Sequence, residues 1–107
     1  MKTILITGAT SGIGLAAAKK LANEKNQLIL CGRRQRKLDE ISEELSKSAN
    51  VLSLCFDVSN KNEVNRLLND LPEQFSSVDV LINNAGNAHG LDTIQDGSLD
   101  DLSLIHI

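Results

Sequence analysis

The stretch Thr7-Gly8-Ala9-Thr10-Ser11-Gly12-Ile13-Gly14 decides the fold of this chain. It follows a short apolar run, residues 3–6, and it opens an alanine-rich helical pattern over residues 15–22. Strand, glycine turn and helix in this order can hold a dinucleotide pyrophosphate, because the helix N-terminus offers free N–H groups and a partial positive charge. We therefore predict a phosphate-binding turn here.

The residues of this turn have separate expected roles. Gly8 can take the sharp turn off the strand, which a Cβ would resist. Gly12 lets the backbone approach a phosphate closely, and Gly14 lets the helix pack tightly on the strand. The hydroxyls of Thr10 and Ser11 offer further phosphate contacts, and the alternative is that they only cap the helix.

Short β-like runs alternate with helical periodicity along the whole chain. Strands are expected at residues 3–6, 27–31, 51–56 and 78–82, and helices at 12–23, 34–46, 60–69 and from about Ser98 onward. The first helix is expected to place Ile13, Ala17 and Leu21 on one face, the second to turn Leu38, Ile41 and Leu45 inward, and Asn60 can cap the third. The run 27–31 is continuously apolar, as is typical of a parallel strand buried on both faces. The alternation predicts an α/β fold, a Rossmann-type parallel sheet of strand order 3-2-1-4 flanked by helices.

Composition and charge narrow the class of protein. The chain has 107 residues, of which 41% are hydrophobic and 23% charged, as is ordinary for one globular domain. Complete doubly wound α/β enzymes often run to ~200–250 residues, so the chain is short for one. Its net charge of −3 gives no reason to expect nucleic acid or an anionic membrane as a partner.

The sequence also indicates where the protein is located and whether its cysteines are free. Met1 and Lys2 lead straight into the first strand, which leaves no room for a signal peptide, and no apolar run has transmembrane length. We therefore expect a cytoplasmic protein. Cys31 and Cys55 lie in apolar runs and are expected to be buried free thiols, and no cysteine–histidine spacing suggests a metal site.

The end of the second strand bears on the choice of nucleotide. NAD-binding folds place Asp or Glu there, ~20 residues beyond the glycines, to bind the ribose hydroxyls. This chain has Gly32, Arg33 and Arg34 instead, and a guanidinium binds phosphate through paired hydrogen bonds. We therefore favour NADP over NAD. A solvated basic helix start is the alternative, but such residues oppose the helix dipole.

Polar residues also follow the third and fourth strands. Asp57-Val58 lies where a ligand crevice is expected, and Asp57 could accept a hydrogen bond from the adenine amine or simply form the turn before the next helix. The residues of Asn83-Asn84-Ala85-Gly86 are small enough for close approach of a ribose. Their asparagines could tie the strand to its neighbours, and a plain turn is the alternative.

Together these four stretches resemble the short-chain dehydrogenase/reductase family, and the resemblance runs from Met1 to about Asp101. The set is far more specific than one glycine-rich loop. The sequence around the motifs, in residues 31–35, 71–73 and 87–91, is similar to that of the NADP-dependent branch that oxidises serine and related 3-hydroxy acids.

The resemblance implies NADP as cofactor and hydride transfer between it and a carbonyl or secondary alcohol of a small molecule, in a parent that forms homo-oligomers. It also implies roles for single residues. The 2′-phosphate would contact Arg33, with Arg34 beside it. The adenine would contact Asp57 and Val58, and the ribose would contact Asn84. The pyrophosphate would contact Gly8, Ala9, Thr10, Ser11, Gly12 and Ile13.

The chain also departs from the family's pattern. Family members use a Ser and a Tyr-x-x-x-Lys pair farther along the chain, and this chain contains no Tyr. Without them no general acid or base is present, so we assign no catalytic residue and expect the chain alone to be inactive.

The last residues, 102–107, fit the family poorly and are expected to be a truncated or out-of-frame end. Residues 1–107 would then form an incomplete NADP-binding half-domain whose fourth strand is an artificial edge, open to mispairing. Two alternatives stay open: a non-catalytic NADP-binding module, and a gene fragment without a function of its own.

Overall fold

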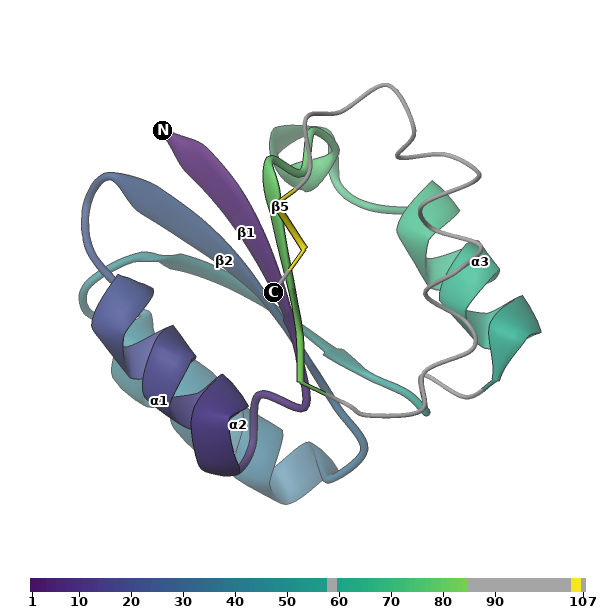
Figure 1. Cartoon of the computed structure of the whole chain (residues 1–107), viewed down its shortest axis with the longest axis horizontal. Coiled ribbons are helices and arrows are strands. Elements are labelled where there is room, and N and C mark those ends of the chain that lie inside the picture. Colours follow the sequence, from purple (N-terminus) through teal and green to yellow (C-terminus); the bar gives the residue numbers. More distant parts are fainter. Residues whose placement is uncertain (58–59, 85–104, 107) are drawn as a thin grey trace.

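The computed structural model describes residues 1–57, 60–84 and 105–106, in which strands and helices alternate. The elements are β1 (Lys2–Thr7), α1 (Gly12–Leu21), β2 (Asn26–Gly32), α2 (Gln35–Leu45), β3 (Asn50–Cys55), α3 (Lys61–Asn69), the short 3₁₀ helix η1 (Glu73–Phe75), β4 (Val80–Asn83) and β5 (Ile105–His106). Helices α1 and α2 lie on one side of the sheet, and α3 and η1 lie on the other (Figure 1). The predicted α/β class is confirmed.

The sheet is parallel throughout and has the order β3-β2-β1-β4-β5. Strand β1 is central, with Ile4 opposite Leu28 of β2 on one side and Val80 of β4 on the other. The predicted order 3-2-1-4 is therefore confirmed for the first four strands. Because all strands run the same way, their carboxyl ends meet at one edge, which is where ligands bind in open α/β sheets.

The expectation that β4 forms the edge of the sheet is wrong. Strand β5 pairs with it in parallel, Val80 opposite Ile105 and Leu81 opposite His106. A strand of two residues has no alternation of polar and apolar residues for sequence reasoning to detect. The helix predicted from about Ser98 lies outside the described residues.

Both faces of the sheet are covered with apolar side chains. Leu5 and Ile29 point toward α3, where they pack with Phe56 and Phe75. Ile4, Ile6, Leu28 and Leu30 point the other way, into a second cluster with residues of α1 and α2. Neighbouring residues in a strand face opposite sides, so continuous burial along β1 and β2 is what a sheet covered on both faces requires.

Helix α2 buries Leu38, Ile41 and Leu45, as its periodicity predicts. Helix α1 agrees with its predicted inward face at Ala17 and Leu21, which pack against the second cluster, and differs from it at Ile13. Its buried residues are Gly14 and Ala18, and the side chain of Ile13 is 75% exposed. The small residues let α1 lie close to the turn and the sheet, while Ile13 in its first turn faces solvent.

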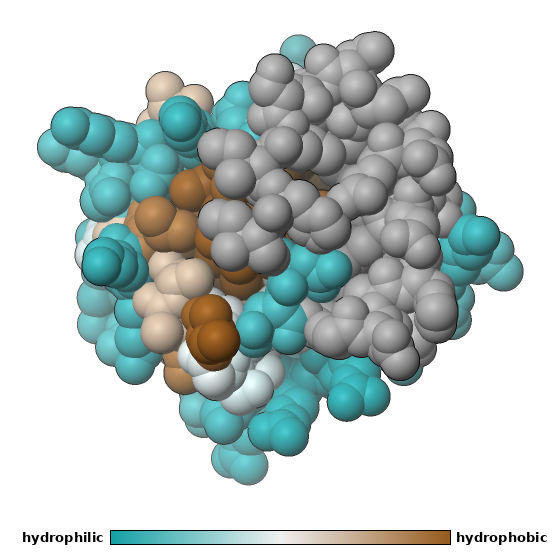
Figure 2. Space-filling model, in the orientation of Figure 1, coloured by the Kyte–Doolittle hydropathy of each residue, from teal (hydrophilic) through white to brown (hydrophobic). Residues whose placement is uncertain are grey.

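The face seen in Figure 2 carries apolar surface over the sheet, and hydrophilic side chains border it at the outside of the molecule. Within residues 1–57, 60–84 and 105–106, no helix has both the length and the apolar character needed to cross a bilayer.

Candidate functional site

The glycine turn leaves β1 through two residues of left-handed conformation. Gly8 has φ of 61° and Gly12 has φ of 58°, values that side chains with a Cβ rarely adopt. Between them, the Ala9 N–H donates a hydrogen bond of 3.1 Å to the Cys31 carbonyl oxygen at the end of β2. The predicted sharp turn at Gly8 is confirmed, and β2 holds it in place.

Glycine suits positions 14 and 12 for different reasons. A Cβ on Gly14 would overlap the Gly8 carbonyl oxygen and lie 2.9 Å from Asn84 Nδ2. Gly14 thus lets α1 pack against the turn itself and against the end of β4, as well as on the strand. A Cβ on Gly12 would meet no atom of the described residues within 4 Å, so the backbone there is open to an approaching ligand.

A buried hydroxyl connects the glycine turn to the end of β4. Thr7 Oγ1 accepts a hydrogen bond of 3.0 Å from the Asn84 N–H and donates one of 3.1 Å to Asn83 Oδ1. The Asn84 side chain then donates from Nδ2 to the Gly8 carbonyl oxygen at 3.3 Å. The predicted tie between these asparagines and a neighbouring strand is confirmed.

Sequence reasoning did not assign this role to Thr7. The available signal was a hydroxyl in an apolar strand next to the turn, since a fully buried hydroxyl must find hydrogen-bond partners. The alternative of a plain turn at Asn83-Asn84 explains less, because both side chains hold the site together.

The hydroxyl residues of the turn lie in unlike surroundings. Thr10 is 6% exposed, and a Cβ added to Gly32 would lie 3.0 Å from its Cγ2 methyl, so Thr10 packs the turn onto the end of β2. Ser11 is exposed at the N-cap of α1 and makes no side-chain capping bond there. The capping alternative is therefore not seen for Ser11, whose hydroxyl lies at the surface beside Gly12.

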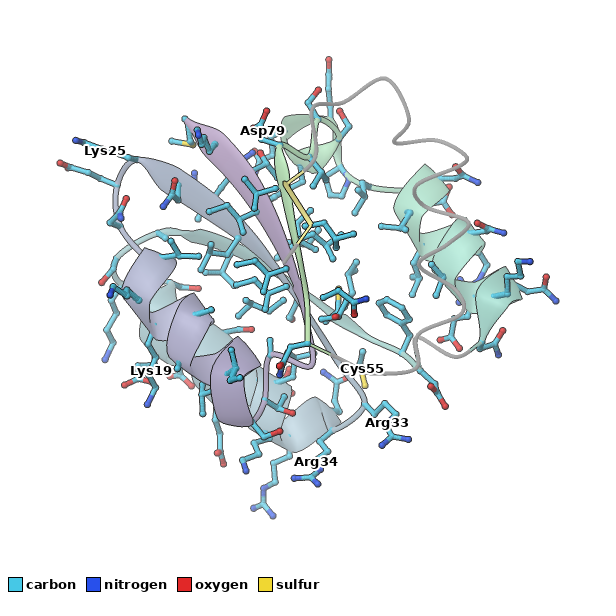
Figure 3. All side chains as sticks on the ribbon, viewed as in Figure 1. Lys19, Lys25, Arg33, Arg34, Cys55 and Asp79 are labelled. Carbon is cyan, nitrogen blue, oxygen red and sulfur yellow. The ribbon has the colours of Figure 1, made fainter. Side chains whose placement is uncertain are left out.

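Arg33 and Arg34 extend from the carboxyl end of β2 into solvent (Figure 3). Arg34 occupies the N-cap of α2, and the first turn of that helix holds no acidic residue. Strand β3 ends beside them, with the Phe56 N–H donating to the Gly32 carbonyl oxygen at 2.9 Å and Cys55 Sγ donating to the Arg33 carbonyl oxygen at 3.5 Å. Both guanidiniums thus lie at the edge of the sheet where the carboxyl ends of the strands meet.

Asp57 is half-buried just after β3, where the sequence places it. Its carbonyl oxygen accepts a hydrogen bond of 2.9 Å from the Asn60 N–H, so its backbone forms the turn before α3. The turn-forming alternative therefore holds for the backbone. Val58, Ala85 and Gly86 lie outside the described residues.

The two cysteines are free thiols in different environments. Cys31 is fully buried, and burial raises the pKa of its thiol from 9.0 to about 12. Cys55 is only partly buried, so the expectation of two buried thiols is right for Cys31 alone. Among residues 1–57, 60–84 and 105–106, no group of three or more His, Cys, Asp or Glu is placed to hold a metal ion.

Four segments distant in sequence therefore meet at one edge of the sheet: the glycine turn, the arginine pair, the end of β3 with Asp57, and the end of β4 with Asn84. The edge offers open backbone N–H groups, the N-terminus of α1 and two exposed guanidiniums. These groups suit a ligand with several phosphates.

Comparisons with known proteins agree with this geometry. The family model described as short chain dehydrogenase matches residues 2–104. An NADP-dependent 3-hydroxy acid dehydrogenase of Schizosaccharomyces pombe is 46% identical over 103 residues, which are 94% of this chain and 40% of that protein. Sulfoacetaldehyde reductase 2 of Chromohalobacter salexigens is 45% identical over 98 residues, 92% of this chain and 39% of that protein.

Solved structures show the same likeness. The closed form of a serine dehydrogenase complexed with NADP⁺ superposes with a TM-score of 0.70 at 33% identity, over 77% of this chain and 32% of that one. The L-sorbose reductase of Gluconobacter frateurii, complexed with NADPH and L-sorbose, gives 0.72 at 35% identity, over 80% and 34% of the two chains.

The chain spans about two fifths of the length of the curated relatives it matches, 39% and 40% for the two above. The match to the family itself leaves out only a few residues at the two ends of this chain. From the glycine turn, the sheet order and this match, we conclude that the chain belongs to the short-chain dehydrogenase family.

Proposed function

We propose that this chain is the NADP-binding part of an oxidoreductase that transfers a hydride between NADP and a carbonyl or secondary alcohol. One observation carries the proposal. The carboxyl edge of the sheet brings the open glycine turn, residues 8–14, to the same side as the exposed Arg33 and Arg34. This combination suits a dinucleotide that carries a third phosphate.

The residues present fit this cofactor. The pyrophosphate would lie at the N-terminus of α1, where Gly12 leaves the backbone open, and Arg33 with Arg34 would hold the 2′-phosphate. The exposed Ile13 offers apolar surface next to the turn. The same proposal assigns pyrophosphate contacts to Gly8, Ala9, Thr10, Ser11, Gly12 and Ile13, adenine contacts to Asp57 and Val58, and a ribose contact to Asn84.

When bound, the nicotinamide supplies the redox chemistry, and the protein binds and orients it. The contribution of this chain is positional. The bonds from Asn84 to Gly8 and Thr7 hold the end of β4 against the turn, and the bond from Ala9 to Cys31 holds the turn against β2.

A small 3-hydroxy acid such as serine is the substrate class that we propose for the whole protein. The names of two relatives support it, a 3-hydroxy acid dehydrogenase and a serine dehydrogenase. Sulfoacetaldehyde reductase and L-sorbose reductase are also among the relatives, so the wider class stays a carbonyl or alcohol compound. We further propose that the whole protein is a cytoplasmic homo-oligomer.

A titration of the protein with NADPH and with NADH, followed by nucleotide fluorescence, tests the cofactor assignment. NADPH is expected to bind more tightly. Arg33→Ala should weaken the binding of NADPH by roughly 10- to 100-fold, as the loss of a charged hydrogen bond predicts. The same substitution should change the binding of NADH much less. Arg66→Ala, which removes an exposed arginine from α3, is the matched control. Equal loss for both nucleotides in Arg33→Ala would remove the 2′-phosphate assignment.

Turnover is a separate test. We expect the 107-residue chain to bind NADP without reducing it, because no catalytic Tyr or Lys can be assigned in it. Appearance of NADPH fluorescence when the purified chain is mixed with NADP and serine would contradict this expectation.

A further inference from the structure

Helix α2 carries its charges in an order that opposes its own dipole. Arg34 stands at its N-cap, Arg36 and Lys37 follow, and the first turn holds no acidic residue. At the other end are Glu43 and Glu44, and the last turn holds no basic residue. Acidic side chains stabilise a helix N-terminus and basic ones its C-terminus, so the order of charges along α2 does not favour its stability.

The other two α-helices of the described residues do not share this reversal. Helix α3 has Glu63 in its first turn and Arg66 in its last. Helix α1 has Lys19 and Lys20 in its last turn. The unfavourable order is therefore a property of α2, and it calls for a reason outside the helix.

The basic end of α2 lies at the ligand edge of the sheet. Its N-terminus follows the carboxyl end of β2, and Figure 1 shows it at the same lower edge as the N-terminus of α1, where the glycine turn lies. Arg33, Arg34, Arg36 and Lys37 are all exposed and fall within five consecutive residues of a chain whose net charge is −3. The acidic residues of α2 all follow the basic ones. Asp39 and Glu40 come within one turn of Lys37, and Glu43 and Glu44 lie about 10 Å along the helix from Arg36 and Lys37, toward the amino ends of the strands.

We propose that Arg36 and Lys37 form an electrostatic steering surface for the anionic dinucleotide, additional to the phosphate contacts of Arg33 and Arg34. This inference rests on the proposed function, because it assumes that NADP(H) binds at this edge. A local positive field attracts a ligand with several phosphates and raises its association rate. The glutamates at the far end of α2 make the field directional, since they repel the same ligand from the opposite edge.

Stopped-flow measurement of NADPH association, at salt between about 10 and 300 mM, tests the steering surface. In the variant Arg36→Gln/Lys37→Gln, the association rate constant should fall by roughly 3- to 10-fold at low salt. The dissociation rate constant should stay within about twofold, and the dependence of association on salt should become shallower, since steering acts over the Debye length. The melting temperature should rise by about 2–6 °C, because the opposing charges are gone.

A matched control removes two positive charges elsewhere. Lys19→Gln/Lys20→Gln neutralises the last turn of α1, where lysines agree with the helix dipole. Its association rate constant should change by less than about twofold, and its melting temperature should fall. The two variants thus share a change in net charge and differ in the sign of the stability change.

Other outcomes overturn the proposal. Equal slowing in both variants would show an effect of net charge alone, and unchanged association in Arg36→Gln/Lys37→Gln would remove the steering role. Faster dissociation without slower association would indicate direct contact. The charge-conserving variant Arg36→Lys/Lys37→Arg must keep wild-type association, because steering depends on charge alone. Absence of NADPH binding in the wild type would instead refute the proposed function itself.

Discussion

Gly14 is the residue at which the fold and the candidate site constrain each other, because a Cβ there would overlap the Gly8 carbonyl oxygen. Gly14→Ala would ordinarily favour a helix by about 1 kcal/mol. Here we expect a net loss of stability of about 2–4 kcal/mol, since the obstacle is backbone that holds the turn. Urea unfolding monitored by circular dichroism measures it.

Gly12→Ala is the control for that substitution. It has the unfavourable φ of 58° but no neighbouring atom among the described residues, so conformational strain of about 1–2 kcal/mol is its whole expected cost. If Gly14→Ala were as stable as the wild type, the close packing of α1 on the turn would be wrong.

Cys31 makes stability depend on pH in the alkaline range. Its folded-state pKa of about 12 exceeds the ordinary value of 9.0, so the folded protein binds this proton more strongly than the unfolded chain does. The contribution is fully present below pH 9 and is lost as pH rises from 9 to about 12. The loss is at most about 1.4 kcal/mol for each pH unit in that window.

Denaturant unfolding of the wild type and of Cys31→Val, from pH 8 to the alkaline limit of folding, measures this effect. The variant has no thiol to ionise, so the stability difference between the two proteins should shift in favour of the variant as pH rises above 9. Cys55→Val, at the partly buried thiol, serves as the control. A constant difference for Cys31→Val would contradict the assignment.

At the residue scale, the positions that need a special backbone could be predicted from the sequence. Gly8 and Gly12 are recognisable because only glycine readily adopts a positive φ beside a phosphate-binding turn. The roles of Thr7 and Ile13 were harder to predict. The partners of the Thr7 hydroxyl lie on β4, and the exposure of Ile13 depends on how α1 packs on the sheet. The hydrogen bonds of Thr7 join residues 76 and 77 positions apart and leave no local pattern.

At the scale of the element, α3 shows how a side chain starts a helix. Asn60 Oδ1 accepts a hydrogen bond of 3.1 Å from the Glu63 N–H, one of the N–H groups that the helix leaves without an internal partner. Asn60→Ala should lower stability by about 1 kcal/mol. Asn62→Ala, at an exposed position of the same helix, should leave stability unchanged or raise it slightly. Thermal melts of the two variants test the cap, and equal melting temperatures would argue against it.

Helices and strands were predictable within one or two residues where their signals were strong. The periodicity of Leu38, Ile41 and Leu45 placed α2, and the Asn60 cap placed α3. The short helix η1 was missed, because three residues after Pro72 hold too little pattern to distinguish a 3₁₀ turn from a loop.

At the scale of the whole molecule, strand order followed from general rules about parallel sheets, whereas the outer neighbour of β4 did not. Right-handed crossovers of similar length make β3-β2-β1-β4 the natural order. Strand β5 has two residues, and its pairing depends on the free edge that β4 offers. Sequence reasoning therefore treated as an edge a strand that has neighbours on both sides.

The two sides of the sheet differ in a way that hydrogen exchange can measure. In a parallel strand, successive residues direct their N–H groups to opposite neighbours. Strand β4 lies between β1 and β5, so the amides of both Leu81 and Ile82 should exchange at least about 100-fold more slowly than in an unfolded peptide. Strand β3 provides the comparison, because it pairs only with β2 in the described sheet. Only one of the two amides of Leu52 and Ser53 should therefore be protected. Nuclear magnetic resonance of the labelled protein resolves these four amides. The pairing of β5 with β4 is wrong if Leu81 and Ile82 show the same alternation as Leu52 and Ser53.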